Sequence, residues 1–303
     1  MKRVLVTGAS GFIGRQVLPQ LAASGWEVHA VQMESTVSGI EKVTWHSGNL
    51  LDREVVRNLV SGIQPSHLLH LAWYAKPGEY WSSPENFRWV ISSLEMANIF
   101  SELGGKRIVV AGTCAEYDWA YGYCREGVTP LVPATLYGRC KNGLQQLLKD
   151  FGETSELEVV WGRIFNIYGP NEAKSRLVPS VTNSLLRGEI ANCTHGKQVR
   201  DYLHVYDVAS AFKALLENDF VGAVNIGSGN PVTVRELVSA IAKRLNSMDL
   251  VRFGALPVSP NEASFVVADN SRLQQLGWKP VYDLEQGIDD TISWWQSQDE
   301  LAP

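Results

Sequence analysis

Cysteine and histidine are scarce and scattered, which argues against a metal or redox centre. Four cysteines and six histidines occur among 303 residues, and no two cysteines form a Cys-x-x-Cys pair. Metal and redox sites usually show such closely spaced ligands in the sequence. We therefore expect no metal ion.

Basic charge and long apolar runs are also lacking. Lysine and arginine total 27 against 32 acidic residues, and the formal net charge is -5. Nucleic-acid-binding proteins normally carry a basic surplus, so we expect no nucleic-acid partner. No apolar run approaches the roughly 20 residues of a membrane helix. The apolar run nearest the N-terminus is too short for a signal-peptide core. The sequence thus predicts a cytoplasmic protein without a membrane partner.

Short apolar runs alternate with amphipathic segments, which is typical of a parallel sheet covered by helices on both faces. The expected strands are 2–7, 28–31, 43–46, 68–72, 108–111 and 159–164, and the expected helices are 12–23, 53–61, 86–103, 177–187, 234–245 and 284–296. We predict an α/β fold: a doubly wound parallel Rossmann sheet with a smaller C-terminal α/β substrate-binding domain. The first domain should span 1–165, with segments near 200–228 crossing back, and the second mainly 166–303.

A glycine-rich turn joins the first expected strand to the first expected helix. Gly8, Gly11 and Gly14 have the spacing Gly-x-x-Gly-x-x-Gly. Glycine lets the backbone turn sharply and approach a pyrophosphate, and the helix N-terminus offers unpaired N–H groups. A plain strand-to-helix turn is the alternative, but the context of strand and helix predicts a dinucleotide site.

Tyr137 and Lys141 lie four residues apart and would share one face of a helix. The ordinary pKa of a phenol is roughly 10, and a nearby ammonium favours the ionised form. The pair therefore predicts a proton carrier whose pKa is lowered by Lys141 and by a positively charged nicotinamide. An exposed aromatic–lysine pair without chemistry is the alternative interpretation.

Five ordered segments resemble the extended short-chain dehydrogenases, the NAD-dependent epimerase/dehydratase family. They are the turn at 7–14, Tyr137-x-x-x-Lys141, Arg163-Ile164-Phe165-Asn166-Ile167-Tyr168-Gly169-Pro170, Arg200-Asp201-Tyr202-Leu203-His204-Val205 and Leu276-Gly277-Trp278-Lys279-Pro280. The resemblance runs across nearly the whole chain. It implies an NAD(P)-dependent enzyme acting on nucleotide sugars in polysaccharide biosynthesis.

The resemblance also implies roles for individual residues. The expected catalytic residues are Thr113, Tyr137 and Lys141. The expected cofactor-binding residues are Gly8, Gly11, Phe12, Ile13, Gly14, Gln32, Asn49, Leu50, Leu71, Ala72, Trp73, Tyr137 and Lys141. The expected substrate-binding residues are Thr113, Tyr117, Asn166 and Arg200. Structural alternatives remain: Thr113 as a local turn residue, Leu71 and Ala72 as sheet core, Asn166 as a turn cap, and Arg200 paired with Asp201.

The end of the second strand leaves NAD and NADP open. An acid there would hold the ribose hydroxyl of NAD, and a nearby arginine would suit the 2′-phosphate of NADP. Gln32 can donate to a phosphate, whereas Glu34 would repel one, and Arg15 is equally well explained as a solvated helix residue. The balance leans to NADPH.

Aromatic residues near 73–81 and 117–126 suit a sugar or nucleobase, and a domain-interface core is the equal alternative. Together with segment 129–137, they resemble those of enzymes that reduce 4-keto nucleotide sugars. We therefore expect hydride transfer to a keto carbon, with Tyr137 protonating the oxygen. An NAD-dependent epimerase uses the same groups, and a catalytically silent dinucleotide-sensing or scaffold protein is the alternative from another class. Dehydration is disfavoured, because Cys114-Ala115 stands where the family's dehydratases place an Asp-Glu pair.

One departure from the family concerns phosphate binding. Many relatives carry an Arg-Pro-Gly-Asp-like segment where this chain has Ser259-Pro260-Asn261-Glu262, so a second phosphate-binding arginine is missing. Arg176, Arg235 and Arg252 are the candidates to replace it. Relatives often dimerise through the helix that carries the catalytic tyrosine, so we also expect a homodimer.

Overall fold

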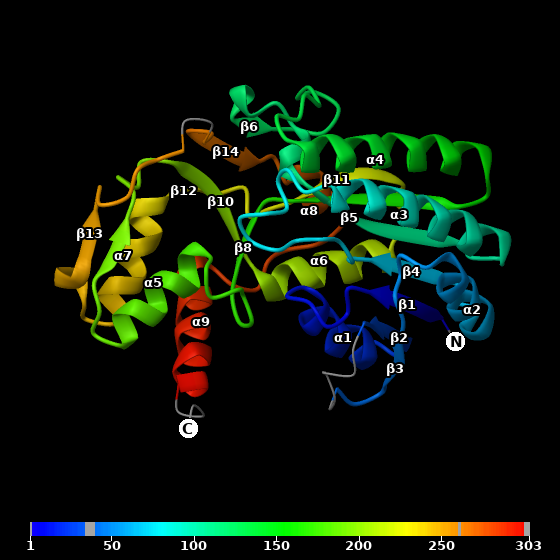
Figure 1. Ribbon diagram of the computed structural model, residues 1–303, viewed down its shortest axis with the longest axis horizontal. Coiled ribbons are helices and arrows are strands. Elements are labelled where there is room, and N and C mark those ends of the chain that lie inside the picture. Colours follow the sequence, from blue (N-terminus) through cyan, green and yellow to red (C-terminus); the bar gives the residue numbers. More distant parts are fainter. Residues whose placement is uncertain (1, 34–39, 260–261, 300–303) are drawn as a thin grey trace.

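The larger part of the protein is a seven-stranded parallel sheet (Figure 1). The computed structural model describes residues 2–33, 40–259 and 262–299. The strand order is β11-β7-β5-β4-β1-β2-β3. The strands are β1 (Arg3–Thr7), β2 (Glu27–Gln32), β3 (Val43–Ser47), β4 (His67–His70), β5 (Arg107–Thr113), β7 (Glu158–Ile164) and β11 (Gly222–Ile226). The order reverses between β1 and β4, where doubly wound sheets bind ligands. The predicted Rossmann fold is confirmed.

Strand β1 shows why helices cover both faces of this sheet. Val4 and Val6 pack in one core with α1 and α6, and Leu5 packs in the other with α2, α3 and α4. Successive strand side chains point to opposite faces, so a fully apolar strand needs cover on both. The helices are α1 (Gly14–Ala23) and α6 (Val205–Glu217) on one face, and α2 (Arg53–Ile63), α3 (Glu85–Glu102) and α4 (Leu136–Thr154) on the other (Figure 1).

Helix α4 matters most for the site, and its start is fixed by a side chain. The hydroxyl oxygen of Thr135 accepts a hydrogen bond from the backbone N–H of Gly138 at 3.1 Å. Such a cap satisfies one of the free N–H groups of a first helical turn. It places Tyr137 in the first turn of α4 and Lys141 in the second.

A second, smaller sheet lies beside the first, with the order β12-β10-β14-β6 and β8 also paired to β10. Its strands are β6 (Tyr123–Cys124), β8 (Asn166–Tyr168), β10 (Val199–His204), β12 (Pro231–Thr233) and β14 (Phe265–Ala268). The paired strands β9 (Ala191–Cys193) and β13 (Val251–Phe253) and the helices α5 (Leu177–Leu186), α7 (Val234–Arg244) and α9 (Leu284–Asp299) belong to the same end of the molecule (Figure 1).

The chain passes between the two parts more than once. Strand β10 lies in the smaller sheet, whereas α6 and β11, which follow it, cover and extend the larger one. Short helix α8 (Ser271–Gln275) then contacts β11. The domain limits predicted from the sequence stay a prediction.

Candidate active site

The glycine turn is pressed against the strand next to it. Gly8 has a φ of 64°, and a Cβ there would lie 2.7 Å from the nitrogen of Ala72 and 2.8 Å from the carbonyl carbon of Leu71. A Cβ on Gly14 would lie 2.4 Å from the carbonyl oxygens of Gly8 and Ala9. Only glycine fits these two positions, so the backbone turn stays open toward the sheet edge, as a bound pyrophosphate requires.

The start of α1 adds N–H donors to this turn. None of the described side chains caps the first turn of α1, whose preceding residue is Ile13. Free N–H groups and the positive end of the helix dipole favour an anion at such a terminus. The residues present therefore fit the pyrophosphate of a dinucleotide.

Buried hydrogen bonds among Thr7, His70 and Ser93 lie next to the glycine turn. The Thr7 hydroxyl lies 2.7 Å from Nδ1 of His70 and accepts the N–H of Ala72 at 3.2 Å. Nε2 of His70 lies 2.8 Å from the Ser93 hydroxyl. Burial lowers the pKa of His70 to about 3, so the imidazole is neutral. These hydrogen bonds connect β1, β4 and α3 at the place where the cofactor would lie.

The structure brings Thr113 and Tyr137 together. Thr113 ends β5, and its side chain hydrogen-bonds the Tyr137 hydroxyl. The Tyr137 ring meets Tyr80 edge-on at a centroid distance of 4.9 Å, Trp81 at 5.7 Å and Trp73 at 6.4 Å. The phenol therefore faces the carboxyl edge of the sheet from within a group of aromatic rings.

Lys141 joins this group through Trp73 rather than through the phenol. Its ammonium donates a hydrogen bond to the Ala111 carbonyl oxygen at 2.8 Å and lies 3.7 Å from the centre of the Trp73 ring. Burial lowers the pKa of Lys141 to about 7, against the opposing influence of Glu116. Lys141 thus gains and loses its proton near neutral pH.

The pKa of Tyr137 moves in the direction opposite to the one expected. Burial raises it above the ordinary value of 10, nearby Tyr80 raises it further, and the hydrogen bond from Thr113 opposes both. The sequence suggested that Lys141 would lower this pKa. That expectation is wrong for the protein chain itself, because the amine is directed to a carbonyl oxygen and an indole ring. The phenol is therefore held in its protonated form.

Glu116 supports the site, and sequence reasoning overlooked it. Its buried carboxylate accepts the N–H of Thr113 at 2.8 Å, Nε1 of Trp161 at 2.9 Å and Nε of Arg163 at 2.6 Å. These contacts fix the position of Thr113 and explain the arginine of the Arg163 motif as a structural partner. The pattern Thr113-x-x-Glu116 is a capping box and was visible in the sequence.

The other expected cofactor residues occupy the same sheet edge. Leu71 and Ala72 contribute to the sheet core and also meet the glycine turn. Gln32 ends β2 and is buried, and Asn49 and Leu50 follow β3. The remaining residues, Phe12 and Ile13, are partly buried at the start of α1.

Glu34 and Arg15 are the two charged residues that bear on the choice between NAD and NADP. Glu34, which weighed against NADP, lies outside the described residues. Arg15 is exposed and donates through Nε to the Ser10 carbonyl oxygen at 2.8 Å. The predicted preference for NADPH therefore rests on Gln32 alone.

The four expected substrate residues differ in their surroundings. Tyr117 is buried, and its hydroxyl donates to Asn225 at 2.8 Å, so its predicted substrate contact receives no support here and stays a prediction. Thr113 lies beside Tyr137, as described above. Asn166 begins β8, opposite Tyr202 of β10.

Arg200 lies on β10 and does not pair with its neighbour in the sequence. Its guanidinium donates to Glu262 at 3.0 Å and to the Val199 carbonyl oxygen at 2.8 Å. The Asp201 carboxylate instead accepts the N–H groups of Ser228 and Gly229. The alternative of an Arg200–Asp201 pair is therefore wrong, because each residue has another partner.

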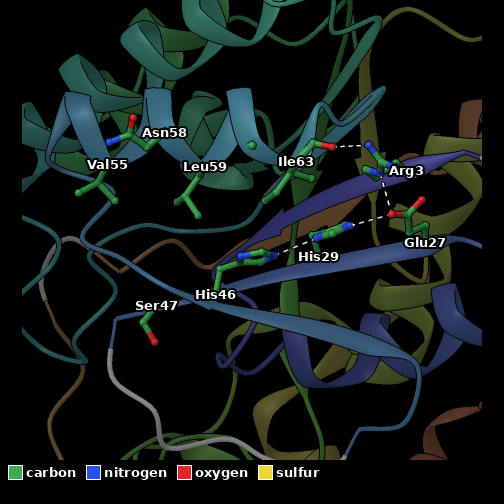
Figure 2. Close-up of a pocket in the computed structure, with 10 residues that line it drawn as sticks. Arg3, Glu27, His29, His46, Ser47, Val55, Asn58, Leu59 and Ile63 are labelled. Carbon is green, nitrogen blue, oxygen red and sulfur yellow. Dashed lines mark hydrogen bonds and ion pairs between the residues drawn. The ribbon is translucent and has the colours of Figure 1, made fainter.

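A separate groove of about 550 Å³ lies between α2 and the strands β2 and β3 (Figure 2). Oε1 of Glu27 lies 2.8 Å from Nε of Arg3 and 3.2 Å from Nε2 of His29. Nδ1 of His29 lies 2.9 Å from Nε2 of His46. None of the residues predicted for catalysis, cofactor or substrate lines this groove.

Two further features are absent from the described residues. They contain no group of three or more His, Cys, Asp or Glu side chains arranged to hold a metal ion. Within the same residues, no helix has both the length and the apolar character needed to cross a bilayer.

Known proteins resemble this chain over nearly its full length. The model of a family described as "NAD dependent epimerase/dehydratase family" matches residues 4–227. UDP-glucose 4-epimerase of Rhizobium meliloti is 29% identical, over 96% of this chain and 96% of that protein. CDP-abequose synthase of Salmonella typhimurium is 26% identical, over 95% and 97%. The structure of Thermus thermophilus UDP-glucose 4-epimerase in complex with NAD superposes with a TM-score of 0.83 at 26% identity, over 97% and 99%.

Proposed function

Since the chain belongs to the NAD dependent epimerase/dehydratase family, we propose that it reduces a 4-keto nucleotide sugar with NAD(P)H. The protein is an enzyme of that family. The observation that carries the proposal is the hydrogen-bonded Thr113–Tyr137 pair at the sheet edge, with its phenol held protonated.

Each residue has a defined part in this reaction. Gly8, Gly14 and Trp73 would help to hold the dinucleotide, which supplies a hydride when bound. Tyr137 gives its phenolic proton to the oxygen at C4 of the sugar. Thr113 hydrogen-bonds the same oxygen and keeps it near the phenol. Lys141, whose ammonium is held by the Ala111 carbonyl oxygen and the Trp73 ring, would place its positive charge beside the bound dinucleotide.

A protonated Tyr137 fits the acid role that reduction requires. A reductase needs the phenol as an acid, whereas the first step of an epimerase removes a proton from the C4 hydroxyl and needs the phenolate. Burial keeps Tyr137 in the acid form. Only an oxidised nicotinamide carries the positive charge that would favour the phenolate.

Epimerisation is the second candidate, because UDP-glucose 4-epimerases are among the relatives. An epimerase must also turn its keto intermediate over so that both faces meet the cofactor. The rings of Tyr80, Trp81 and Trp73 lie around the phenol, on the side where such a rotation would take place.

The nucleotide carried by the purified protein separates these functions. The protein is denatured, and the released nucleotide is separated by chromatography and identified. Exchangeable NADPH, together with turnover of 4-keto-6-deoxyhexoses linked to UDP, CDP or dTDP, supports the reductase. Tightly retained NAD with interconversion of 4-hydroxyl sugars favours the epimerase. A protein that binds no dinucleotide would be a scaffold.

The cofactor preference is tested by titration with NADH and NADPH. We propose NADPH, because Gln32 carries no charge that repels a 2′-phosphate. Equal affinity for the two cofactors would contradict this choice.

A further inference from the structure

Arg176 directly precedes α5 and contacts the aromatic rings around the catalytic phenol. Its guanidinium carbon lies 5.4 Å from the centre of the Tyr80 ring, and the guanidinium also hydrogen-bonds the Tyr80 hydroxyl. The Tyr80 ring in turn packs edge-on against Tyr137 at 4.9 Å. A single aromatic ring therefore separates this arginine from the proton donor.

The charge of Arg176 is not neutralised by a partner. No carboxylate in the described part of the chain lies within ion-pair distance of its guanidinium. Glu172 is near, and one of its carboxylate oxygens is buried without a hydrogen-bond partner among the described residues. Burial raises the pKa of Glu172 to about 8, against the opposing charge of Arg176. At pH 7 the carboxyl of Glu172 is therefore mostly neutral. Arg200, by contrast, forms an ion pair with Glu262 at 3.0 Å.

The other two candidate arginines are engaged elsewhere. The Arg235 guanidinium stacks 3.8 Å from the centre of the Phe253 ring and donates to the His195 carbonyl oxygen at 2.9 Å. Arg252, on β13, donates to the carbonyl oxygens of Asp249 and Val251. Both pack around the β9–β13 pair, and neither contacts the rings around Tyr137. Arg176 alone of the three stands at the site.

We propose that Arg176 binds the pyrophosphate of the nucleotide sugar and replaces the arginine that segment 259–262 lacks. This inference rests on the proposed function. C1, which carries the phosphate, lies across the sugar ring from C4, so an anion-binding group is needed one sugar ring away from the phenol. A guanidinium can donate two parallel hydrogen bonds to a phosphate. The uncapped start of α5, whose preceding residue is Arg176 itself, adds N–H donors on the same side.

The test is nucleoside diphosphate binding by Arg176→Gln, measured calorimetrically with UDP, CDP and dTDP. We expect the dissociation constant of the best ligand to rise about tenfold to a hundredfold, the usual cost of losing a charge-assisted hydrogen bond in a site. Arg252→Gln is the matched control and should bind like the wild type. Affinity for NAD(P)H should be unchanged in both variants, which also shows that they fold.

Unchanged UDP, CDP and dTDP affinity in Arg176→Gln would overturn the inference while leaving the proposed function intact. A loss confined to a UDP-uronic acid would also overturn it, because Arg176 would then bind a carboxylate on the sugar. If the wild type binds no nucleoside diphosphate, the proposed function fails, and the inference fails with it. Should Arg176→Gln not fold, Arg176→Lys takes its place: it keeps the charge but loses the planar fork, and we expect a smaller loss of affinity.

Discussion

Replacing Tyr137 with phenylalanine removes the hydroxyl oxygen, and with it the transferable proton, and leaves the ring in place. The contacts with Tyr80, Trp81 and Trp73 are made by the ring and should survive. The fold loses only the hydrogen bond with Thr113, which contributes about 1 kcal/mol. Any large effect of Tyr137→Phe must therefore come from chemistry rather than from folding.

The expected loss of rate follows from the role of the phenol. General acid catalysis by a positioned side chain contributes about 10²- to 10⁴-fold. Because burial holds the phenol protonated, the wild-type group is already in its reactive form at pH 7. We therefore expect kcat of Tyr137→Phe to fall by about two to four orders of magnitude, with little change in cofactor affinity.

Single-turnover kinetics measure this directly. The enzyme is loaded with NADPH and mixed with a 4-keto nucleotide sugar, and the loss of reduced nicotinamide absorbance is followed. Thr113→Val serves as a matched variant, because it keeps the shape and removes the hydroxyl that orients the same oxygen. A rate for Tyr137→Phe within tenfold of the wild type would refute the assignment of Tyr137 as the acid.

Three further changes test the surrounding structure. Gly14→Ala places a Cβ 2.4 Å from two carbonyl oxygens, so the turn must shift. We expect the dissociation constant of NAD(P)H, measured by fluorescence titration, to rise about 100-fold. Wild-type affinity in this variant would contradict the close approach of the backbone to the cofactor. Lys141 has a pKa of about 7 and loses its charge as the pH rises through that value, so the rate of reduction should fall above pH 7, and Lys141→Met should abolish this limb of the pH profile. Glu116→Gln leaves the buried guanidinium of Arg163 without its carboxylate and should lower the free energy of unfolding by about 3–5 kcal/mol in urea titrations; a loss below 1 kcal/mol would argue against this pair.

Local patterns in the sequence were enough to predict the central features. The glycine spacing, read with its strand and helix, predicted the tight turn between β1 and α1, and the four-residue spacing of Tyr137 and Lys141 placed both on α4. The family, the fold and the enzymatic nature of the chain are confirmed. The NADPH preference, the homodimer and the cytoplasmic location stay predictions.

What the sequence could not supply depends on residues far apart in the chain. The pKa of Tyr137 is set by burial and by Tyr80, a residue from the loop before α3, and neither follows from the amine at i+4. The strand β10 was not predicted, because its buried polar residues break the apolar pattern. Arg200 finds Glu262 and Asp201 finds the backbone of Ser228 only in the folded chain.

A structure of the enzyme with NAD(P) and a nucleotide sugar bound would show whether Tyr137 is placed to protonate the sugar. We expect the Tyr137 hydroxyl to lie within hydrogen-bond distance, about 3 Å, of the oxygen at C4 of the sugar. The reacting carbon of the nicotinamide should lie about 3.5 Å from C4 itself. A ternary complex in which the nicotinamide lies far from this phenol, with no water or side chain between them to carry a proton, would contradict it.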